Sequence, residues 1–324
     1  MDTADLRVSR GSVSLRSCIV GSMVEFFQHL MNGLTLGGIY ALIALGYTMV
    51  YGILKFINFA HGDVLMVGSY IGLFVYNFIR GEVLGAWSIL AFFLSMLVGM
   101  VFSALLGMTI ERVAYKPLRK ATRLAPLLSA IGISFILSNL AAWFWGTKSR
   151  KLEYPFDNTP LYIGEVSITP HQILILAVVV VMMVSLKLFV DKTRIGKAMR
   201  ATSLDQDTAK LMGIRVDRVI SITFAVGSAL AATAGILIAL EIKVYPSMGT
   251  MTGLKAFVAA VVGGIGSISG AMVGGILLGL LETFGVALLG IPYGLRDTIA
   301  FVVLIIILLL KPEGILGKAE KEKV

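Results

Sequence analysis

Long apolar runs separated by short polar segments constrain this chain more than any other feature of its sequence. A transmembrane helix needs about 20 mainly apolar residues, because it must cross the hydrocarbon core of the bilayer. Several segments approach this length. They are Phe27–Tyr51, His61–Ile79, Trp87–Ile110, Pro126–Gly146, Gln172–Val190, Val219–Leu240, Gly270–Leu289 and Thr298–Leu310. The pattern therefore predicts a chain that crosses a membrane many times.

A further apolar piece, Ala256–Val262, follows Lys255 and is too short for an ordinary span. It is typical of a half-helix or a re-entrant segment. The predicted fold is an all-α, polytopic transmembrane bundle of about 8 spans (8–9), with broken or re-entrant helices and a pseudo-repeat. We place the membrane domain at 23–316, after a polar N-terminal segment at 1–22 and before a cytoplasmic tail at 317–324.

Composition supports lipid as the solvent for much of the fold. Hydrophobic residues make up 57% of the chain and charged residues 15%, whereas soluble domains are typically about 45–50% apolar and about 25% charged. The net charge of +9 does not indicate nucleic-acid binding, because the basic residues form no basic-aromatic stripe. Cys18 is the single cysteine, which excludes an intrachain disulfide and a thiolate metal cluster.

The basic residues predict which loops face the cytoplasm. Glu111–Arg123 holds five basic residues against one acid, and Asp191–Arg218 holds seven basic residues. Loops rich in lysine and arginine stay on the cytoplasmic side. The Thr147–Pro170 connection has balanced charge and is expected outside. The N-terminal side is left open, since three arginines precede an odd set of spans.

The lysines of the tail predict a cytoplasmic C-terminus, which requires an even number of crossings after Arg218. Three full spans follow Arg218. We therefore favour a short additional crossing within Gly253–Gly266 over a tail on the outside.

Two glycine-rich regions, Gly33–Tyr70 and Gly253–Glu282, resemble each other weakly. In each, an apolar stretch breaks at a polar knot and then resumes. We call 58–63 the first knot and 263–267 the second knot. Broken helices at matching points indicate a transporter with internal repeats, and close helix packing is the alternative explanation for the glycines.

The stretch 196–214 is patterned although it lies outside the apolar runs. Ser203 is expected to be an N-cap, with Gln206 completing a capping box. Gly213 is placed to end the helix in a left-handed conformation. Leu204, Thr208, Leu211 and Met212 then share one mostly apolar face. Such a short helix needs a surface to pack on; the alternatives to a partner protein are lipid and the chain's own loops.

This stretch resembles the coupling loop by which permeases of ATP-binding cassette (ABC) importers engage their ATPases. It is most similar to the branched-chain amino acid uptake permeases, closer to the first, shorter permease of such systems. The resemblance runs from Leu34 to Leu316. It rests on residues of the loop, of 36–46 with the first knot, and of 259–267 with the glycines that follow. Those residues include Gly196, Arg200, Ala201, Asp205, Ala209, Gly213, Ile214, Gly270, Gly274, Gly275 and Glu282.

The resemblance implies a heteromeric importer in the cell inner membrane. Its parts would be a second permease subunit, two cytoplasmic ATP-binding subunits and an external substrate-binding protein. The cargo of that family is leucine, isoleucine and valine, and similar permeases carry other amino acids, urea or short amides. ATP hydrolysis would belong to the partners, and this sequence contains no G-x-x-x-x-G-K-[ST] phosphate loop. No cofactor and no metal is expected.

Two sets of residues are candidates for function. The ATPase-coupling set is Gly196, Arg200, Ala201, Ser203, Leu204, Asp205, Ala209, Leu211, Met212 and Gly213. The translocation-path or gating set is Asn58, His61, Gly62, Asp63, Gly263, Gly264, Gly266 and Glu282.

Ionisable residues in membrane segments are costly and usually functional. His61 and Asp63 are expected at a helix start near cytoplasmic water, where Asn58 is well suited to cap the helix. The alternatives are gating and a proton relay. Glu282 is expected to pair either with a partner subunit or with the first knot.

The rival functions are a proton-coupled secondary transporter and a channel-like facilitator. An enzyme is disfavoured, because the sequence has no H-E-x-x-H or G-x-S-x-G motif and its three histidines are dispersed. The predicted function is that of a transport subunit.

Overall fold

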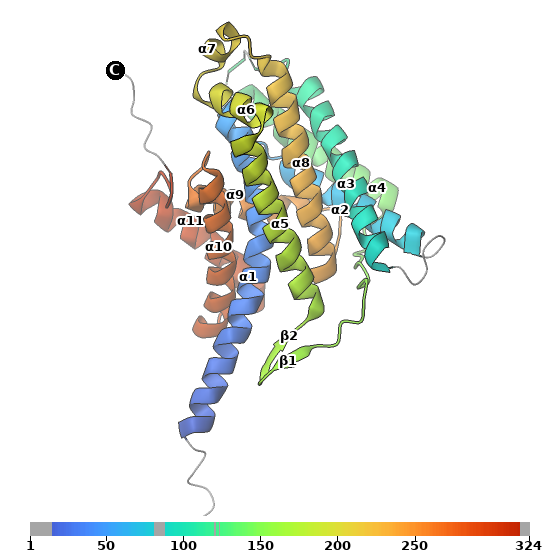
Figure 1. Cartoon of the computed structure of the whole chain (residues 1–324), viewed down its shortest axis with the longest axis vertical. Coiled ribbons are helices and arrows are strands. Elements are labelled where there is room, and N and C mark those ends of the chain that lie inside the picture. Colours follow the sequence, from blue (N-terminus) through green and yellow to red (C-terminus); the bar gives the residue numbers. More distant parts are fainter. Residues whose placement is uncertain (1–14, 81–87, 120, 123, 318–324) are drawn as a thin grey trace, which may run out of the picture.

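Helices form nearly all of the described structure (Figure 1). This computed structural model describes residues 15–80, 88–119, 121–122 and 124–317. In chain order the elements are α1 (Leu15–Leu54), α2 (His61–Phe78), α3 (Ser88–Ile110) continued by the π-helix η2 (Glu111–Tyr115), α4 (Leu124–Trp145), β1 (Leu161–Ile163), β2 (Val166–Ile168), α5 (Pro170–Lys192), α6 (Arg194–Leu204), α7 (Gln206–Leu211), α8 (Val216–Glu241), α9 (Met248–Gly263), α10 (Ile268–Leu289), the 3-10 turn η3 (Tyr293–Leu295) and α11 (Arg296–Leu310). Of these helices, α1, α5, α8 and α10 lie roughly along the long axis of the structure (Figure 1).

In the described part of the chain, 6 helices are long and apolar enough to cross a membrane. They are α1, α3 with η2, α4, α5, α8 and α10. The helices α2, α9 and α11 are shorter, with 18, 16 and 15 residues. The predicted all-α polytopic bundle is confirmed. The predicted N-terminal segment lies partly in α1, while residues 1–14 and 318–324 fall outside the described residues.

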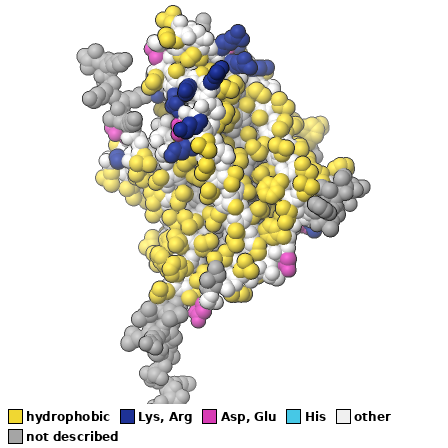
Figure 2. Space-filling model, in the orientation of Figure 1, with side chains coloured by type: hydrophobic (Ala, Val, Ile, Leu, Met, Phe, Trp, Pro, Cys, Tyr) yellow, Lys and Arg dark blue, Asp and Glu magenta, His cyan; other side chains and the backbone are white. Residues whose placement is uncertain are grey.

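The core of the bundle lies around α1 and α8. Ile39 and Leu42 of α1 and Leu237 of α8 are fully buried. By contrast, α4 is the most exposed of the spans, with Phe135 and Trp143 on the surface. Apolar side chains cover the middle of the molecule in Figure 2. Such a surface is unfavourable in water and is stable against lipid or another membrane-spanning subunit.

The two basic loops meet at one end of the bundle, as the positive-inside rule predicts. Lys116 Nζ lies 2.9 Å from Asp217 Oδ2, and Arg119 Nη1 lies 2.6 Å from Asp217 Oδ1. Figure 2 shows lysine and arginine side chains gathered at the end that carries α6 and α7. We call this end the cytoplasmic face.

The opposite end carries the Thr147–Pro170 connection and the β1–β2 hairpin (Figure 1). The Ser167 amide donates to Gln28 Oε1 at 3.1 Å, and Arg150 pairs with Val244 in an antiparallel bridge. The first part of α1 and the end of α8 therefore lie beside the outer connection. Thus α1 runs from the outer face to the cytoplasmic face. This gives the side of the membrane on which α1 begins, which the sequence left open.

Helix α9, an apolar helix of 16 residues, covers most of the segment in which we predicted a short crossing. It begins after the outer end of α8 and spans about 24 Å at 1.5 Å per residue. Its end touches the segment after α11, where the Ile315 amide donates to Val262 O at 2.9 Å and the Leu316 amide donates to Gly263 O at 3.0 Å. Residues 315–316 therefore lie at the cytoplasmic face.

The two glycine-rich regions pack directly on each other, α1 against α10 and α2 against α9. A Cβ on Gly37 would lie 2.7 Å from the carbonyl oxygen of Ile276, and a Cβ on Gly62 would collide with Gly249. Close approach of backbones is thus the role of these glycines, and it holds both regions in one unit.

Candidate functional site

The patterned cytoplasmic stretch forms two helices, α6 and α7, rather than one. Asp205 lies between them, and its Oδ1 accepts hydrogen bonds from the amides of Asp207 at 2.8 Å and Thr208 at 3.1 Å. The predicted N-cap at Ser203 is therefore wrong. Ser203 lies in the last turn of α6, where its hydroxyl donates to Arg200 O at 2.8 Å. Asp205 displaces it because a carboxylate can accept both exposed amides of the next helix.

The predicted end of this stretch at Gly213 is confirmed. Gly213 has φ +81°, its amide donates to Lys210 O at 3.0 Å, and the Ile214 amide donates to Ala209 O at 3.0 Å. This pair of bonds is a Schellman motif, which requires a left-handed residue after the helix. A fixed stop holds α7 at a defined angle to α8.

The coupling candidates divide into anchors and an exposed apolar face. Ala209 and Gly196 are buried, and a Cβ on Gly196 would collide with the backbone of Val190. In contrast, the exposed fractions of Leu204, Leu211 and Met212 are 88%, 88% and 78%. They belong to two helices, Leu204 to the end of α6 and the other two to the end of α7, so the single helical face predicted from their spacing is wrong. We call these three exposed side chains together the exposed apolar face.

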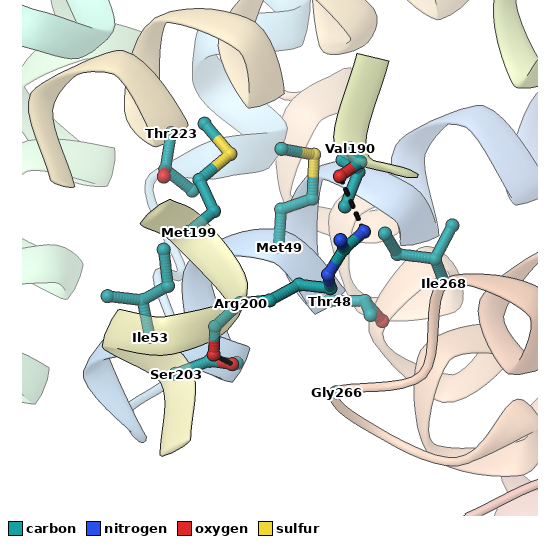
Figure 3. Close-up of a pocket in the computed structure, with 11 residues that line it drawn as sticks. Thr48, Met49, Ile53, Val190, Met199, Arg200, Ser203, Thr223, Gly266 and Ile268 are labelled. Atoms are coloured by element: carbon teal, nitrogen blue, oxygen red, sulfur yellow. Dashed lines mark hydrogen bonds between the residues drawn. The ribbon is translucent and has the colours of Figure 1, made fainter. Parts of the chain in front are cut away.

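Arg200 fastens α6 to the end of α5 (Figure 3). Its Nη1 donates to Val190 O at 2.7 Å and to Asp191 Oδ1 at 3.0 Å. Within the described chain this guanidinium therefore holds α6 in place. The half-buried Ala201 follows it in α6.

Helix α6 also reaches the second knot. Arg200 and Ser203 line a small cavity of about 80 Å³ together with Thr48 of α1 and Gly266 of the second knot (Figure 3). From the sequence we assigned the coupling loop and the second knot to two separate sets of candidate residues. The structure brings them together, because the turn between α9 and α10 lies at the cytoplasmic face.

The first knot is buried, which corrects the expected position of its charges near water. The exposed fractions of His61 and Asp63 are 2% and 0%. The chain turns back into the protein after α1, so that α2 begins below the surface. The predicted cap by Asn58 is also wrong. Ala60 is the N-cap residue and makes no side-chain bond, while Asn58 Oδ1 accepts from the Tyr115 hydroxyl at 2.6 Å.

Contacts of the first knot join several helices. The Ser134 hydroxyl of α4 donates to Asp63 Oδ2. The His61 ring packs edge-on against Tyr47 of α1, with 4.7 Å between ring centroids. The other side of the His61 ring fits against Gly46, where a Cβ would collide with it. The knot is thus a packed junction within the bundle.

The second knot uses its glycines in different ways. Gly264 and Gly266 have φ +108° and +92°, conformations that favour glycine. A Cβ on Gly264 would lie 2.5 Å from the backbone nitrogen of Gly317, whereas nothing lies within 4 Å of a Cβ on Gly266. Gly263 packs against Gly270 so closely that a Cβ would collide with it.

Glu282 pairs with residues of its own chain and not with the first knot. Its exposed fraction is 0%. Oε1 lies 3.1 Å from Lys255 Nζ, and Oε2 lies 3.0 Å from the Tyr40 hydroxyl and 3.1 Å from Arg296 Nε. Lys255 Nζ is also 2.5 Å from Asp297 Oδ1. We call these five residues the outer charge cluster.

Sequence reasoning missed most of this cluster. Lys255 carried a signal, because a lysine inside a short apolar segment must find a partner. Tyr40 and Glu282 are separated by 242 positions, so no local pattern could have paired them. Glu111 was missed in the same way: it is fully buried, binds Arg119, and accepts from the Ser221 hydroxyl at 2.6 Å.

Two cavities adjoin the outer charge cluster, with volumes of about 410 Å³ and about 310 Å³. Residues of α1, α8 and α11 line both of them. In the described part of the chain, no group of three or more histidine, cysteine, aspartate or glutamate side chains is placed to hold a metal ion.

A helical bundle with an apolar outer surface, buried polar junctions and a structured cytoplasmic loop is typical of a multi-pass membrane protein. The family model for the branched-chain amino acid transport system / permease component matches residues 29–308. The chain belongs to this family, and the resemblance predicted from the sequence is confirmed. It is a multi-pass inner-membrane protein.

Curated relatives match over almost their whole length. The chain is 43% identical over 306 residues to the high-affinity branched-chain amino acid transport system permease protein BraD of Pseudomonas aeruginosa, covering 93% of this chain and 98% of that one. It is 44% identical over 307 residues to LivH of Escherichia coli K12, covering 92% and 98%.

Among solved structures, a chain of PsaBC from Streptococcus pneumoniae in complex with Fab is similar in fold. The TM-score is 0.50 with 13% identity, over 92% of this chain and 97% of that chain.

Proposed function

We propose that this chain is the membrane-spanning subunit of an ATP-driven importer for leucine, isoleucine, valine or related small amino acids. A second permease subunit, two cytoplasmic ATP-binding subunits and an external substrate-binding protein complete the importer. The proposal is supported by the family membership and by two relatives, 43% and 44% identical over nearly their full lengths, that are named as permease proteins of high-affinity branched-chain amino acid transport systems.

The observation that carries the coupling role is the exposed apolar face of Leu204, Leu211 and Met212. These side chains lie at the cytoplasmic face, on helices fixed by a cap and a Schellman stop. Burying a leucine side chain stabilises a contact by about 1.5–3 kcal/mol. A groove on an ATPase is the partner that this face fits.

Motion of the ATPase would reach the membrane through fixed contacts. Gly196 seats α6 on the end of α5, and Arg200 bonds it there. The same helix adjoins Gly266 in the turn between α9 and α10. A push on α6 therefore bears directly on α5 and on the second knot.

The test replaces Leu204→Asp and Leu211→Asp together. The ATPases should no longer co-purify with the membrane subunit, and ATP-driven leucine uptake into proteoliposomes should be lost. Burying two new charges adds to the lost apolar contact. The matched control, Leu204→Met with Leu211→Met, keeps the face apolar and should retain both. Wild-type recovery of the ATPases with the aspartate variant would refute the docking role.

A further inference from the structure

The outer charge cluster lies where α9, α10 and the start of α11 meet α1. It brings two cations, Lys255 and Arg296, together with two acids, Glu282 and Asp297. Lys255 and Glu282 are buried. Charges at such depth are retained in membrane proteins where they pair or meet a ligand. The cluster has no net charge when all four groups are ionised.

A further acid faces the same space. Glu241 lies at the end of α8 and lines both cavities, as Arg296 does. Its Oε2 lies 3.1 Å from His171 Nε2. The two volumes, about 410 Å³ and about 310 Å³, fall in the range of about 300–1,000 Å³ that is typical of small-molecule sites.

The walls between these charges are apolar. Leu36 and Ile242 line both cavities, and Ile39 and Ile238 line the smaller one. The space thus presents cationic side chains, a carboxylate and an aliphatic wall. An α-amino acid with an aliphatic side chain carries the matching groups: a carboxylate, an ammonium and an apolar side chain.

We propose that this space is a binding site for a zwitterionic aliphatic amino acid at the outer mouth of the permease. Arg296 and Lys255 bind the carboxylate, because guanidinium and ammonium groups make charge-assisted bonds to it. Glu241 binds the ammonium group, and Leu36 and Ile242 contact the side chain. This site rests on the proposed function and gives the permease a selectivity of its own.

The balance of charge favours a zwitterion over a simple ion. A zwitterion offers its carboxylate to Arg296 and its ammonium to Glu241, whereas a lone anion meets only the first of these side chains and a lone cation only the second. The same balance disfavours an amide or urea, which would leave the side chains of Arg296 and Glu241 without ionic partners in the ligand.

The test measures protection of a cysteine inside the site. In a Cys18→Ser background, Thr252→Cys places a thiol on the wall of the smaller cavity. A membrane-impermeant thiol reagent added from outside should label it in membranes that contain the complete importer. Leucine at about ten times its Kd should slow labelling about tenfold, because only unoccupied sites react. Leucinamide and 4-methylpentanoate, which each lack one charge, should not slow it.

Substitutions test which charged side chains bind the carboxylate and the ammonium group of leucine. Arg296→Gln or Glu241→Gln in the Thr252→Cys background should abolish protection by leucine while labelling itself persists. Lys243→Gln is the matched control, since Lys243 is an exposed cation nearby that lines neither cavity. Exchanging the pair, Lys255→Glu with Glu282→Lys, should also abolish protection. Full protection in the exchanged pair would mean that the cluster serves only as a structural cross-link.

Uptake in the same membranes separates this site from the proposed function. ATP-driven leucine uptake without any protection of Thr252→Cys by leucine would overturn the site and leave the importer function standing. Protection without ATP-driven uptake would support the site and overturn the importer function. Equal protection by leucine and leucinamide would overturn the assignment of the carboxylate to Arg296 and Lys255.

Discussion

Gly264 and Gly266 are separated by one residue, yet the structure requires glycine at the two positions for different reasons. Both have positive φ. Gly264 also lies against the backbone of Gly317, while the space around Gly266 is open. Close packing, the alternative explanation for the glycines in the sequence, therefore applies to Gly264 and not to Gly266. At Gly266 the requirement is for backbone conformation.

This difference can be measured with asparagine, which tolerates positive φ better than other residues that carry a side chain. Gly266→Asn should keep much of the leucine uptake, and Gly266→Val should lose it, because a left-handed conformation costs about 1–2 kcal/mol for such a residue. Gly264→Asn should lose uptake as fully as Gly264→Leu. The measurement is the uptake rate per permease inserted in the membrane. Normal uptake by Gly264→Asn would show that the contact with Gly317 is dispensable.

At this scale, sequence reasoning identified important residues more readily than their partners. Glu282 was recognised as an intramembrane acid, but its partners Tyr40, Lys255 and Arg296 come from other helices. Residues that pair across the bundle lie far apart in the chain, so no regular spacing in the sequence identifies them as partners. His61 and Asp63 were likewise recognised as candidate functional residues, but their burial was not predicted. A sequence motif does not show how far the loop that carries it folds into the protein.

Among the elements, α6 and α7 are two short helices that together form the structured cytoplasmic loop. The sequence pattern predicted a single helix from Ser203. A cap signal was present, but Asp205 supplies it and Ser203 does not. Serine and aspartate are both good caps, so the choice between adjacent candidates depended on geometry that the sequence does not contain.

Paired alanine variants distinguish the two caps. Asp205→Ala should speed hydrogen exchange of the amides in 206–211 about fivefold, because loss of a cap costs about 1 kcal/mol. Ser203→Ala should leave exchange in 206–211 unchanged, since Ser203 bonds only within α6. The measurement is hydrogen exchange on the purified importer. Faster exchange in 206–211 with Ser203→Ala would reinstate Ser203 as the cap of α7.

The whole molecule has its basic loops at one face and its hairpin at the other (Figures 1 and 2). Most of this arrangement was predictable, since apolar runs mark spans and lysine and arginine mark the cytoplasmic side. The direction of α1 was not predictable. It follows from contacts such as Gln28 with Ser167, which join segments far apart in the chain.

Single cysteines in a Cys18→Ser background test this orientation. Lys116→Cys and Lys197→Cys should react with an impermeant thiol reagent only from the cytoplasmic side. Met23→Cys and Glu165→Cys should react only from the outside, because α1 begins beside the outer connection. Intact and inverted vesicles give the two sides. Labelling of Lys197→Cys from the outside would overturn the orientation and, with it, the docking of an ATPase on α6 and α7.

Helix α9 has a consequence for how the protein is made. It is 16 residues long and carries Lys255, and a lysine at the centre of a helix raises the free energy of insertion by about 2.5–3.5 kcal/mol. The counter-charges, Glu282 and Asp297, are synthesised later. We therefore expect α9 to insert stably only once α10 and α11 have emerged from the ribosome, so that these three helices enter the bilayer as one cooperative unit.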